Sequence, residues 1–208
     1  MQKSKKKPYA EHGKQKIYNV KPIKTKKEMR EMEQAIQLQG NFYDPSGKRG
    51  RRNLMLFYLG CHTGLRVSDL IRLRVHDVID GGQIQIREKK TGKISHAYIN
   101  QKTLKKLKHY IALMHLNKNS YLFPSRKGNN HIGSVQVYRF LVSAGKLIGN
   151  DAVGTHTMRK TFGWMYYKSG GRIEELQQIF NHASPDVTRR YLGIEDEDIN
   201  KKLEKFDF

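Results

Sequence analysis

The chain has 208 residues, of which 40 are Lys or Arg and 19 are Asp or Glu, giving a formal net charge of +21. Its hydrophobic content of 37% is enough for the core of one domain, and the basic excess favours nucleic acid as the partner. Ribosomal-type and membrane-surface proteins share such a charge. However, no apolar run approaches the roughly 18 residues of a membrane span, and no apolar segment follows the basic N-terminus as in a secretory signal.

The single cysteine, Cys61, lies in the apolar segment 54–61. It cannot form a disulfide within the chain, so the sequence indicates a reducing compartment, and we expect a cytoplasmic, nucleoid-associated protein. A catalytic thiol is the sharper interpretation of Cys61. A small buried apolar residue is the simpler one, and it is favoured.

The first part of the chain predicts a tail followed by helices. Residues 1–24 are rich in lysine and predict a basic, disordered arm that orders on phosphates, with a solvated tail as the alternative. Thr25-Lys26-Lys27-Glu28 has the form of a capping box and predicts a helix to about Gln39. A polar loop is expected over 40–50, an apolar helix over 51–61 and a short helix over 67–73.

Alternating apolar and polar residues predict three strands in the middle of the chain, at 75–79, 83–87 and 95–99. Ser184-Pro185 and Gly193 are typical of the start and the end of a helix. The predicted fold class is mainly α with a small three-stranded antiparallel sheet (α+β), as one domain over 25–193 and a helical tail over 194–208. The later helices are expected at 102–116, 134–147, 157–169, 173–180, 185–192 and 196–204.

Two arginines stand in tight local contexts, Arg66 after Thr63-Gly64-Leu65 and Arg159 within the segment 155–161. A guanidinium binds two phosphate oxygens at once and stays charged, so the pair suits the negative charge of a phosphodiester and its transition state. His156 precedes Arg159 by three residues, which places both side chains on one face of a helix. Imidazole exchanges protons near neutral pH.

Tyr191 is the candidate nucleophile, nine residues after His182 and near the end of a short helix. A free phenol has a pKa near 10, so ionising it at pH 7 costs on the order of 4 kcal/mol, which two arginines and a base could offset. A phosphotyrosyl link would keep the energy of the broken bond and allow rejoining without a metal or cofactor.

In this order, the residues resemble the tyrosine recombinase (phage integrase) family from about Thr25 to Gly193. The resemblance implies that fold and a catalytic lysine in a Lys-Thr-Gly-like hairpin turn. Lys90 matches it, with Lys89 and Lys93 as competitors. It also implies that the second histidine contacts the scissile phosphate and that an acidic residue supports the site. The implied catalytic set is Arg66, Lys90, His156, Arg159, His182 and Tyr191, with Asp69 in support.

One departure from the family concerns the second histidine, where Phe180-Asn181-His182 replaces the usual Leu-Gly-His. Because asparagine adopts positive φ less freely than glycine, the local backbone there is in question.

The implied activity is site-specific recombination of DNA through a 3′-phosphotyrosyl intermediate, by integration, excision or inversion. Double-stranded DNA is the expected partner, with a homotetramer at the synapse in which the C-terminal tail docks on a neighbour. Accessory DNA-bending proteins are a further class of partner that the resemblance allows. A type IB topoisomerase and a non-catalytic DNA-binding protein of the same fold remain the alternatives.

Relatives usually carry a helical DNA-clamping domain before the catalytic domain. Here the first predicted helix follows only the short basic arm. We expect a naturally short member that binds DNA weakly and with a steep salt dependence. The alternative is that a partner supplies the clamp.

Overall fold

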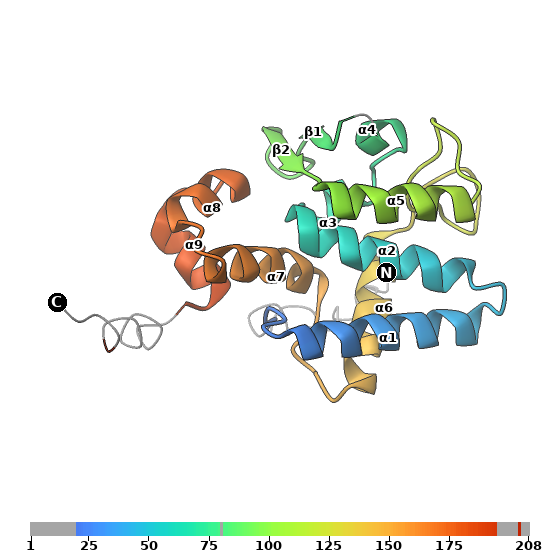
Figure 1. Cartoon of the computed structure of the whole chain (residues 1–208), viewed down its shortest axis with the longest axis horizontal. Coiled ribbons are helices and arrows are strands. Elements are labelled where there is room, and N and C mark those ends of the chain that lie inside the picture. The colour runs from blue at the N-terminus through green and yellow to red at the C-terminus, as the bar shows by residue number, and fades with distance from the viewer. Residues whose placement is uncertain (1–19, 80, 195–203, 205–208) are drawn as a thin grey trace, which may run out of the picture.

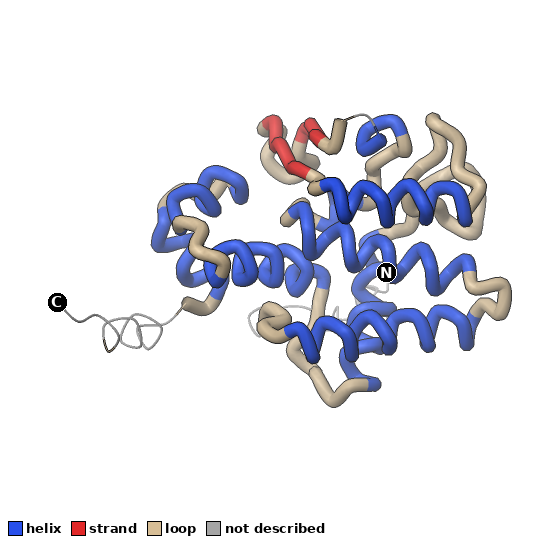
Figure 2. Tube along the Cα trace, in the orientation of Figure 1, coloured by secondary structure: helices blue, strands red, loops and turns tan. Residues whose placement is uncertain are grey.

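The computed structural model describes residues 20–79, 81–194 and 204, and this part of the chain is mainly helical (Figures 1 and 2). Among these residues no helix is both long enough and apolar enough to cross a membrane. The predicted helix at 196–204 and nearly all of the tail lie outside the described residues. The elements in chain order are α1 (Lys26–Tyr43), α2 (Lys48–Thr63), α3 (Val67–Leu70), α4 (His76–Ile79), β1 (Gln83–Arg87), β2 (Ile94–Tyr98), α5 (Gln101–Leu113), α6 (Ser134–Leu147), α7 (Thr155–Lys168), α8 (Ile173–Phe180) and α9 (Pro185–Leu192).

Two hydrophobic clusters hold the described part together. The larger cluster joins α1, α2, α5 and α6, with fully buried side chains such as Phe57 and Leu107. The smaller one lies between α8 and α9 and centres on Phe180 and Leu192. Helix α7 reaches both, because Met158 belongs to the larger cluster and Phe162 packs against the smaller one. Figure 1 shows α7 running from the main helical body toward α8 and α9.

The sheet has two strands among the described residues, not the predicted three. Strands β1 and β2 pair antiparallel with Ile84 opposite Ala97. The prediction of a strand over 75–79 is wrong, because a carboxylate oxygen of Asp77 accepts the Arg74 N–H at 2.7 Å and helix α4 starts there. The Val75 N–H donates to the Ser120 carbonyl at 3.0 Å, so this segment contacts the loop after α5 and does not extend the sheet.

The predicted loop over 40–50 is mostly helical. Helix α1 continues to Tyr43 and α2 begins at Lys48, which leaves only a short turn. The cause is the contact between the two helices, because a Cβ on Gly40 would lie 2.3 Å from the Gly50 Cα. These glycines, interpreted as loop residues, instead let two helix backbones approach closely. The capping box at Thr25 and Glu28 is confirmed.

Residues 20–24, which the sequence assigned to the basic arm, pack on the folded domain. Ile23 is 2% exposed, and its N–H donates to the Thr161 hydroxyl of α7 at 2.9 Å. The Lys21 N–H donates to the Ala152 carbonyl at 2.9 Å. The segment therefore packs against α7, the helix that carries His156 and Arg159.

Candidate active site

Two guanidinium groups meet where α2, α7 and α8 end or begin. Gly64 ends α2 at a φ of 66°, and its carbonyl accepts a hydrogen bond of 2.6 Å from Arg159. The Phe180 carbonyl at the end of α8 accepts from Arg159 at 2.8 Å and from Arg66 at 3.4 Å. Burial lowers the pKa of Arg159 to about 10, which still leaves it charged at neutral pH. Three segments thus hold two cations side by side.

Tyr191 points into the same site from α9. Its hydroxyl lies 3.1 Å from Nδ1 of His156, which is on α7. The phenol ring meets those of His182 and Phe180 edge-on, with centroids 5.2 and 5.7 Å away. Lys160 Nζ lies 5.2 Å from the ring centroid. Burial raises the pKa of Tyr191 to about 12, although the charges of Arg159 and Arg66 act in the opposite direction. In this state Tyr191 is a neutral phenol.

Both histidines are neutral at neutral pH. Burial lowers the pKa of His182 to about 4, with a further contribution from Arg159 and Arg66. Burial and the charges of Arg159, Lys160, Lys90 and Arg66 also lower the pKa of His156. His182 is oriented by Thr188, whose hydroxyl lies 3.0 Å from Nδ1. A neutral imidazole beside a phenol can accept its proton.

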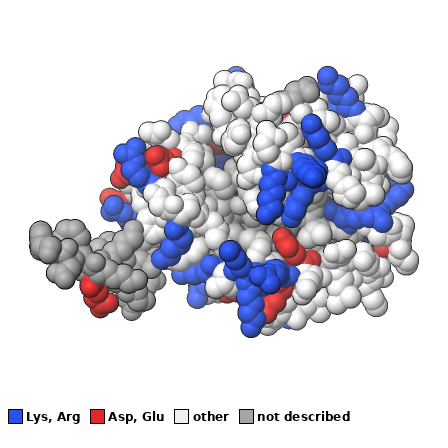
Figure 3. Space-filling model, in the orientation of Figure 1, with Lys and Arg blue, Asp and Glu red and all other residues white. Residues whose placement is uncertain are grey.

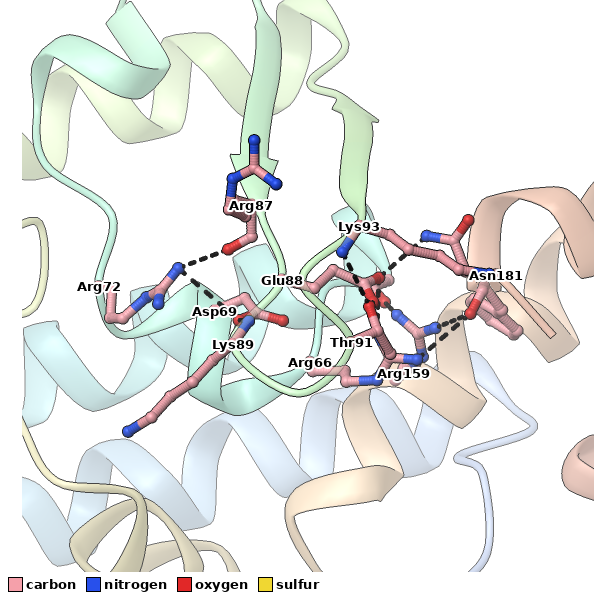
Figure 4. A network of polar contacts seen from close by, with 12 residues as sticks. Arg66, Asp69, Arg72, Arg87, Glu88, Lys89, Thr91, Lys93, Arg159 and Asn181 are labelled. Atoms are coloured by element: carbon pink, nitrogen blue, oxygen red, sulfur yellow. Dashed lines mark hydrogen bonds and ion pairs between the residues drawn. The ribbon is translucent and has the colours of Figure 1, made fainter.

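The turn between β1 and β2 carries the three candidate lysines. Lys90 is exposed, and its charge contributes to the lowered pKa of His156, which ties it to the site electrostatically. The Lys89 backbone N–H donates to Asp69 at 2.9 Å. Figure 4 shows the Lys89 side chain pointing away from Arg66 and Arg159. Of the three candidate lysines, Lys89 therefore has a side chain that points away from the two arginines of the site.

Asp69 supports the turn by direct contacts, and its charge also acts on Arg159. It is 1% exposed, accepts the Lys89 N–H and lies 3.9 Å from the Arg72 guanidinium. Arg72 in turn donates to the Arg87 carbonyl at 2.8 Å. Asp69 thereby fixes the backbone at the end of β1, one residue before Lys90.

Asn181 takes the conformation that its replacement of glycine put in question. It ends α8 with φ 51° and ψ 40°, the left-handed region. Its side-chain amide donates to Glu88 at 3.1 Å, so the asparagine contributes a contact that glycine could not. The Asn181 conformation places the next residue, His182, beside Tyr191.

Glu88 was not among the residues predicted for the site, although its carboxylate contacts Arg66. It is 2% exposed, and its Oε1 lies 2.5 Å from a guanidinium nitrogen of Arg66. The available signal was its position, because it is the only acidic residue in the segment 83–93, which has four basic residues. Cys61, by contrast, is buried in α2, where burial raises the pKa of its thiol, which fits the favoured structural interpretation.

The six predicted residues come from five different segments. Arg66, Arg159, His156, His182 and Tyr191 are connected through the contacts above, and Lys90 lies at the edge of the site. Such a set can clamp an anionic phosphate, accept a proton from a phenol and present that phenol as a nucleophile. Lys and Arg side chains gather at several places on the face in Figure 3, where acidic ones are fewer.

Comparisons with known proteins give matches over most of this chain. Residues 15–198 match the model of the phage integrase family. The probable integrase/recombinase YoeC of Bacillus subtilis is 34% identical over 91% of this chain and 97% of its own length. The tyrosine recombinase XerA of Pyrococcus furiosus is 29% identical, and the match covers 77% of this chain and 56% of that relative.

Solved structures show the same fold. The crystal structure of XerA recombinase aligns with a TM-score of 0.65 at 24% identity, over 89% of this chain and 63% of that one. XerH bound to its difH substrate, in a post-cleavage complex, aligns with a TM-score of 0.68 at 20% identity over 89% of this chain and 52% of that one. The chain therefore belongs to the phage integrase family, the tyrosine recombinases that break and rejoin DNA strands at specific sites.

Proposed function

We propose that this chain cleaves one DNA strand with Tyr191 and forms a 3′-phosphotyrosyl intermediate. The Tyr191 oxygen attacks phosphorus while its proton passes to Nδ1 of His156. The bond from phosphorus to the 5′-oxygen breaks, and that oxygen takes a proton from Lys90. A 5′-hydroxyl of a partner strand then reverses these steps, so integration, excision and inversion share one chemistry.

The observation that carries the proposal is the 3.1 Å contact between the Tyr191 hydroxyl and His156. It supports delivery of the tyrosine to the site of its own chain. Because His156 is neutral, it can accept the proton in the tautomer that is protonated at Nε2. Phosphate binding would add negative charge beside the phenol and favour its neutral form further, so a base is needed at the moment of attack.

Arg66 and Arg159 stabilise the negative charge of the transition state. Both donate to the Phe180 carbonyl, which holds them close enough to contact one phosphate. Fixed donors of this kind contribute more than mobile ones, because they need no reorganisation during the reaction. His182, neutral and oriented by Thr188, supplies a further hydrogen bond to the phosphate.

Double-stranded DNA is the proposed partner, supported by the charge of +21 and by relatives solved with DNA, such as XerH with difH and the Tn1549 integrase with transposon end DNA. We assign the catalytic domain to residues 25–193. A homotetramer at the synapse and accessory DNA-bending proteins belong to the same proposal.

The test is covalent capture from a pool of random-sequence duplexes that carry a nick. Cleavage near the nick releases a short fragment, which prevents rejoining and leaves the protein attached to DNA. Denaturing electrophoresis then separates the adduct, and sequencing of its DNA yields the preferred site. Wild-type protein should give an adduct, and Tyr191→Phe should give none while still binding the selected duplex.

A second duplex with a free 5′-hydroxyl tests strand transfer, which separates recombination from relaxation of supercoils within one duplex. Absence of any wild-type adduct from the pool, with binding retained, would favour a non-catalytic DNA-binding protein. An adduct that persists in Tyr191→Phe would refute the assignment of the nucleophile.

A further inference from the structure

Glu88 connects three parts of the site that the backbone keeps apart. One carboxylate oxygen, Oε1, lies 2.5 Å from Arg66 and accepts from the Asn181 amide at 3.1 Å. The other, Oε2, accepts a short hydrogen bond from the Thr91 hydroxyl. Figure 4 shows Arg66, Thr91 and Asn181 converging on this one side chain. A carboxylate offers about four acceptor positions, and here partners from three segments use them.

The same residue closes the turn that carries Lys90. The Glu88 N–H donates to the Lys93 carbonyl at 2.9 Å, and the Glu88 carbonyl accepts from the Gly92 N–H at 3.0 Å. With the Thr91 contact added, the turn is tied at both ends to one buried group. Lys90 lies between Glu88 and Thr91 in the chain, so its position follows from theirs.

Glu88 is charged despite its burial. Burial acts to raise the pKa of its carboxyl, but the hydrogen bonds from Thr91, Asn181 and Arg66 outweigh it and lower the pKa below the ordinary value. The negative charge lies beside Arg66, which is otherwise close to a second cation, Arg159. A buried charge of this kind is strongly disfavoured unless its partners stay in place.

We propose that Glu88 is a positioning residue for strand cleavage, an inference that rests on the proposed function. Its carboxylate holds Arg66 in the phosphate-binding arrangement and, through Thr91, holds the turn so that Lys90 reaches the leaving 5′-oxygen. The Asn181 contact ties the same carboxylate to the residue before His182. Glu88 itself touches no reacting atom.

A merely structural role and a positioning role differ in the leaving-group step. When sulfur replaces the bridging 5′-oxygen at the selected site, the leaving group departs as a thiolate. Because a thiol has a pKa near 8.5, that thiolate needs no proton from Lys90. A misplaced Lys90 should therefore slow cleavage of the oxygen substrate and leave the sulfur substrate much less affected.

The experiment compares single-turnover cleavage of nicked oxygen and sulfur duplexes of the captured sequence by wild-type protein, Glu88→Ala, Thr91→Val and Lys90→Ala. Thr91→Val breaks the hydrogen bond to Glu88 and a 3.3 Å bond from the Lys93 N–H within the same turn, and it leaves the carboxylate in place. Because position 91 is exposed, this variant keeps the test open if Glu88→Ala does not fold. Glu31→Gln is the matched control, since that carboxylate makes a surface ion pair of 3.8 Å with Lys27 on α1.

General acids typically contribute about 100- to 10,000-fold, so we expect the sulfur-to-oxygen rate ratio to rise at least about tenfold in Glu88→Ala and Thr91→Val, in the direction of Lys90→Ala. Glu31→Gln should keep the wild-type ratio. If both Glu88→Ala and Thr91→Val kept the wild-type sulfur-to-oxygen rate ratio, the positioning role would be overturned. Adduct formation by the wild-type protein would still support the proposed function in that case. Failure of wild-type protein on both substrates would instead contradict the proposed function itself.

Discussion

Nδ1 of His156 lies 3.1 Å from the Tyr191 hydroxyl, although 35 positions separate the two residues in the chain. Helix α7 carries the imidazole and α9 carries the phenol, and Phe162 and Leu192 pack these helices onto the same small cluster. The contact pairs a neutral base with a phenol whose pKa burial raises to about 12. Attack on phosphorus then depends on proton transfer within this pair.

The protonation of His156 gives the first expected pH dependence. Its pKa lies below 6.5, because burial and the nearby cations disfavour the charged form. The base is therefore neutral at pH 7 and is lost only as pH falls through the lowered value. When the DNA concentration is far below saturation, the second-order rate constant for cleavage reports the protonation state of the free protein. We expect that constant to stay level from pH 8 to about 6.5 and to decline below it.

His156→Gln should remove this acidic limb and slow cleavage by about 100-fold or more. His109→Gln, an exposed change on α5, is the control and should keep both rate and limb. An acidic limb centred above the ordinary histidine pKa, or one that persists in His156→Gln, would show that another group is the base.

The three lysines of the hairpin turn can be separated by single substitutions. Lys89 is on the Asp69 side of the turn, whereas the charge of Lys90 acts on His156. We expect Lys90→Ala to slow strand cleavage by about 100-fold or more at unchanged DNA affinity, and Lys89→Ala and Lys93→Ala by less than about tenfold. The rate of strand cleavage in each variant is measured by quenching the reaction at timed intervals and quantifying the covalent adduct. A larger loss in Lys89→Ala or Lys93→Ala would move the catalytic role to that residue.

The sequence predicted those parts of the fold and the site whose signals are local in the chain. The bounds of α6, α8 and α9 were predicted to the residue, because features such as Ser184-Pro185 and Gly193 mark helix ends within a few positions. The catalytic set was identified from the family pattern and stays a prediction of roles. Glu88 could not be assigned to the site this way, since Arg66 and Asn181, the partners that place it there, lie 22 and 93 positions away and only the fold brings them together.

The error over 75–79 had a local signal against it. The segment reads Val-His-Asp-Val-Ile, so its apolar residues follow the spacing of a helix rather than strict alternation, and a carboxylate contact with the Arg74 N–H starts the helical turn. Residues 40–50 were interpreted as a loop because they are polar and contain the turn sequence Asp44-Pro45-Ser46-Gly47. The contact between Gly40 and Gly50 across two helices is tertiary and leaves no local trace.

Asn181 offers a test of why asparagine replaces glycine before His182. Its φ of 51° favours glycine, whereas its amide donates to Glu88 at 3.1 Å. In Asn181→Gly the relief of backbone strain is less than the roughly 1–2 kcal/mol of other residues, because asparagine tolerates this region, and it should partly offset the lost hydrogen bond. The free energy of unfolding should therefore stay within about 1 kcal/mol. Asn181→Ala has neither advantage and should lose about 1–3 kcal/mol.

Urea denaturation measures both variants. Because Asn181→Gly removes a partner of Glu88, its cleavage rate should fall even though its stability is kept. Equal unfolding free energies for the glycine and alanine variants would contradict the backbone argument. A glycine variant with wild-type cleavage would show that the amide contact is dispensable.

Gly64 combines two constraints at the point where Arg159 is held. It ends α2 at a φ of 66°, and a Cβ there would lie 2.5 Å from the Phe162 ring. Gly128 has nearly the same φ, 65°, with nothing within 4 Å of such a Cβ. Backbone strain of about 1–2 kcal/mol should therefore appear in both Gly64→Ala and Gly128→Ala. Only Gly64→Ala should show a further steric cost of about 1–3 kcal/mol.

The difference between the two unfolding free energies in urea isolates the contact with Phe162. Because the Gly64 carbonyl accepts from Arg159 at 2.6 Å, a shift of this turn should also displace the guanidinium and slow adduct formation. Gly128→Ala should cleave at the wild-type rate. If the two variants agreed within about 0.5 kcal/mol, Phe162 would have moved aside freely, and the turn would not be the rigid support of Arg159 that its geometry indicates.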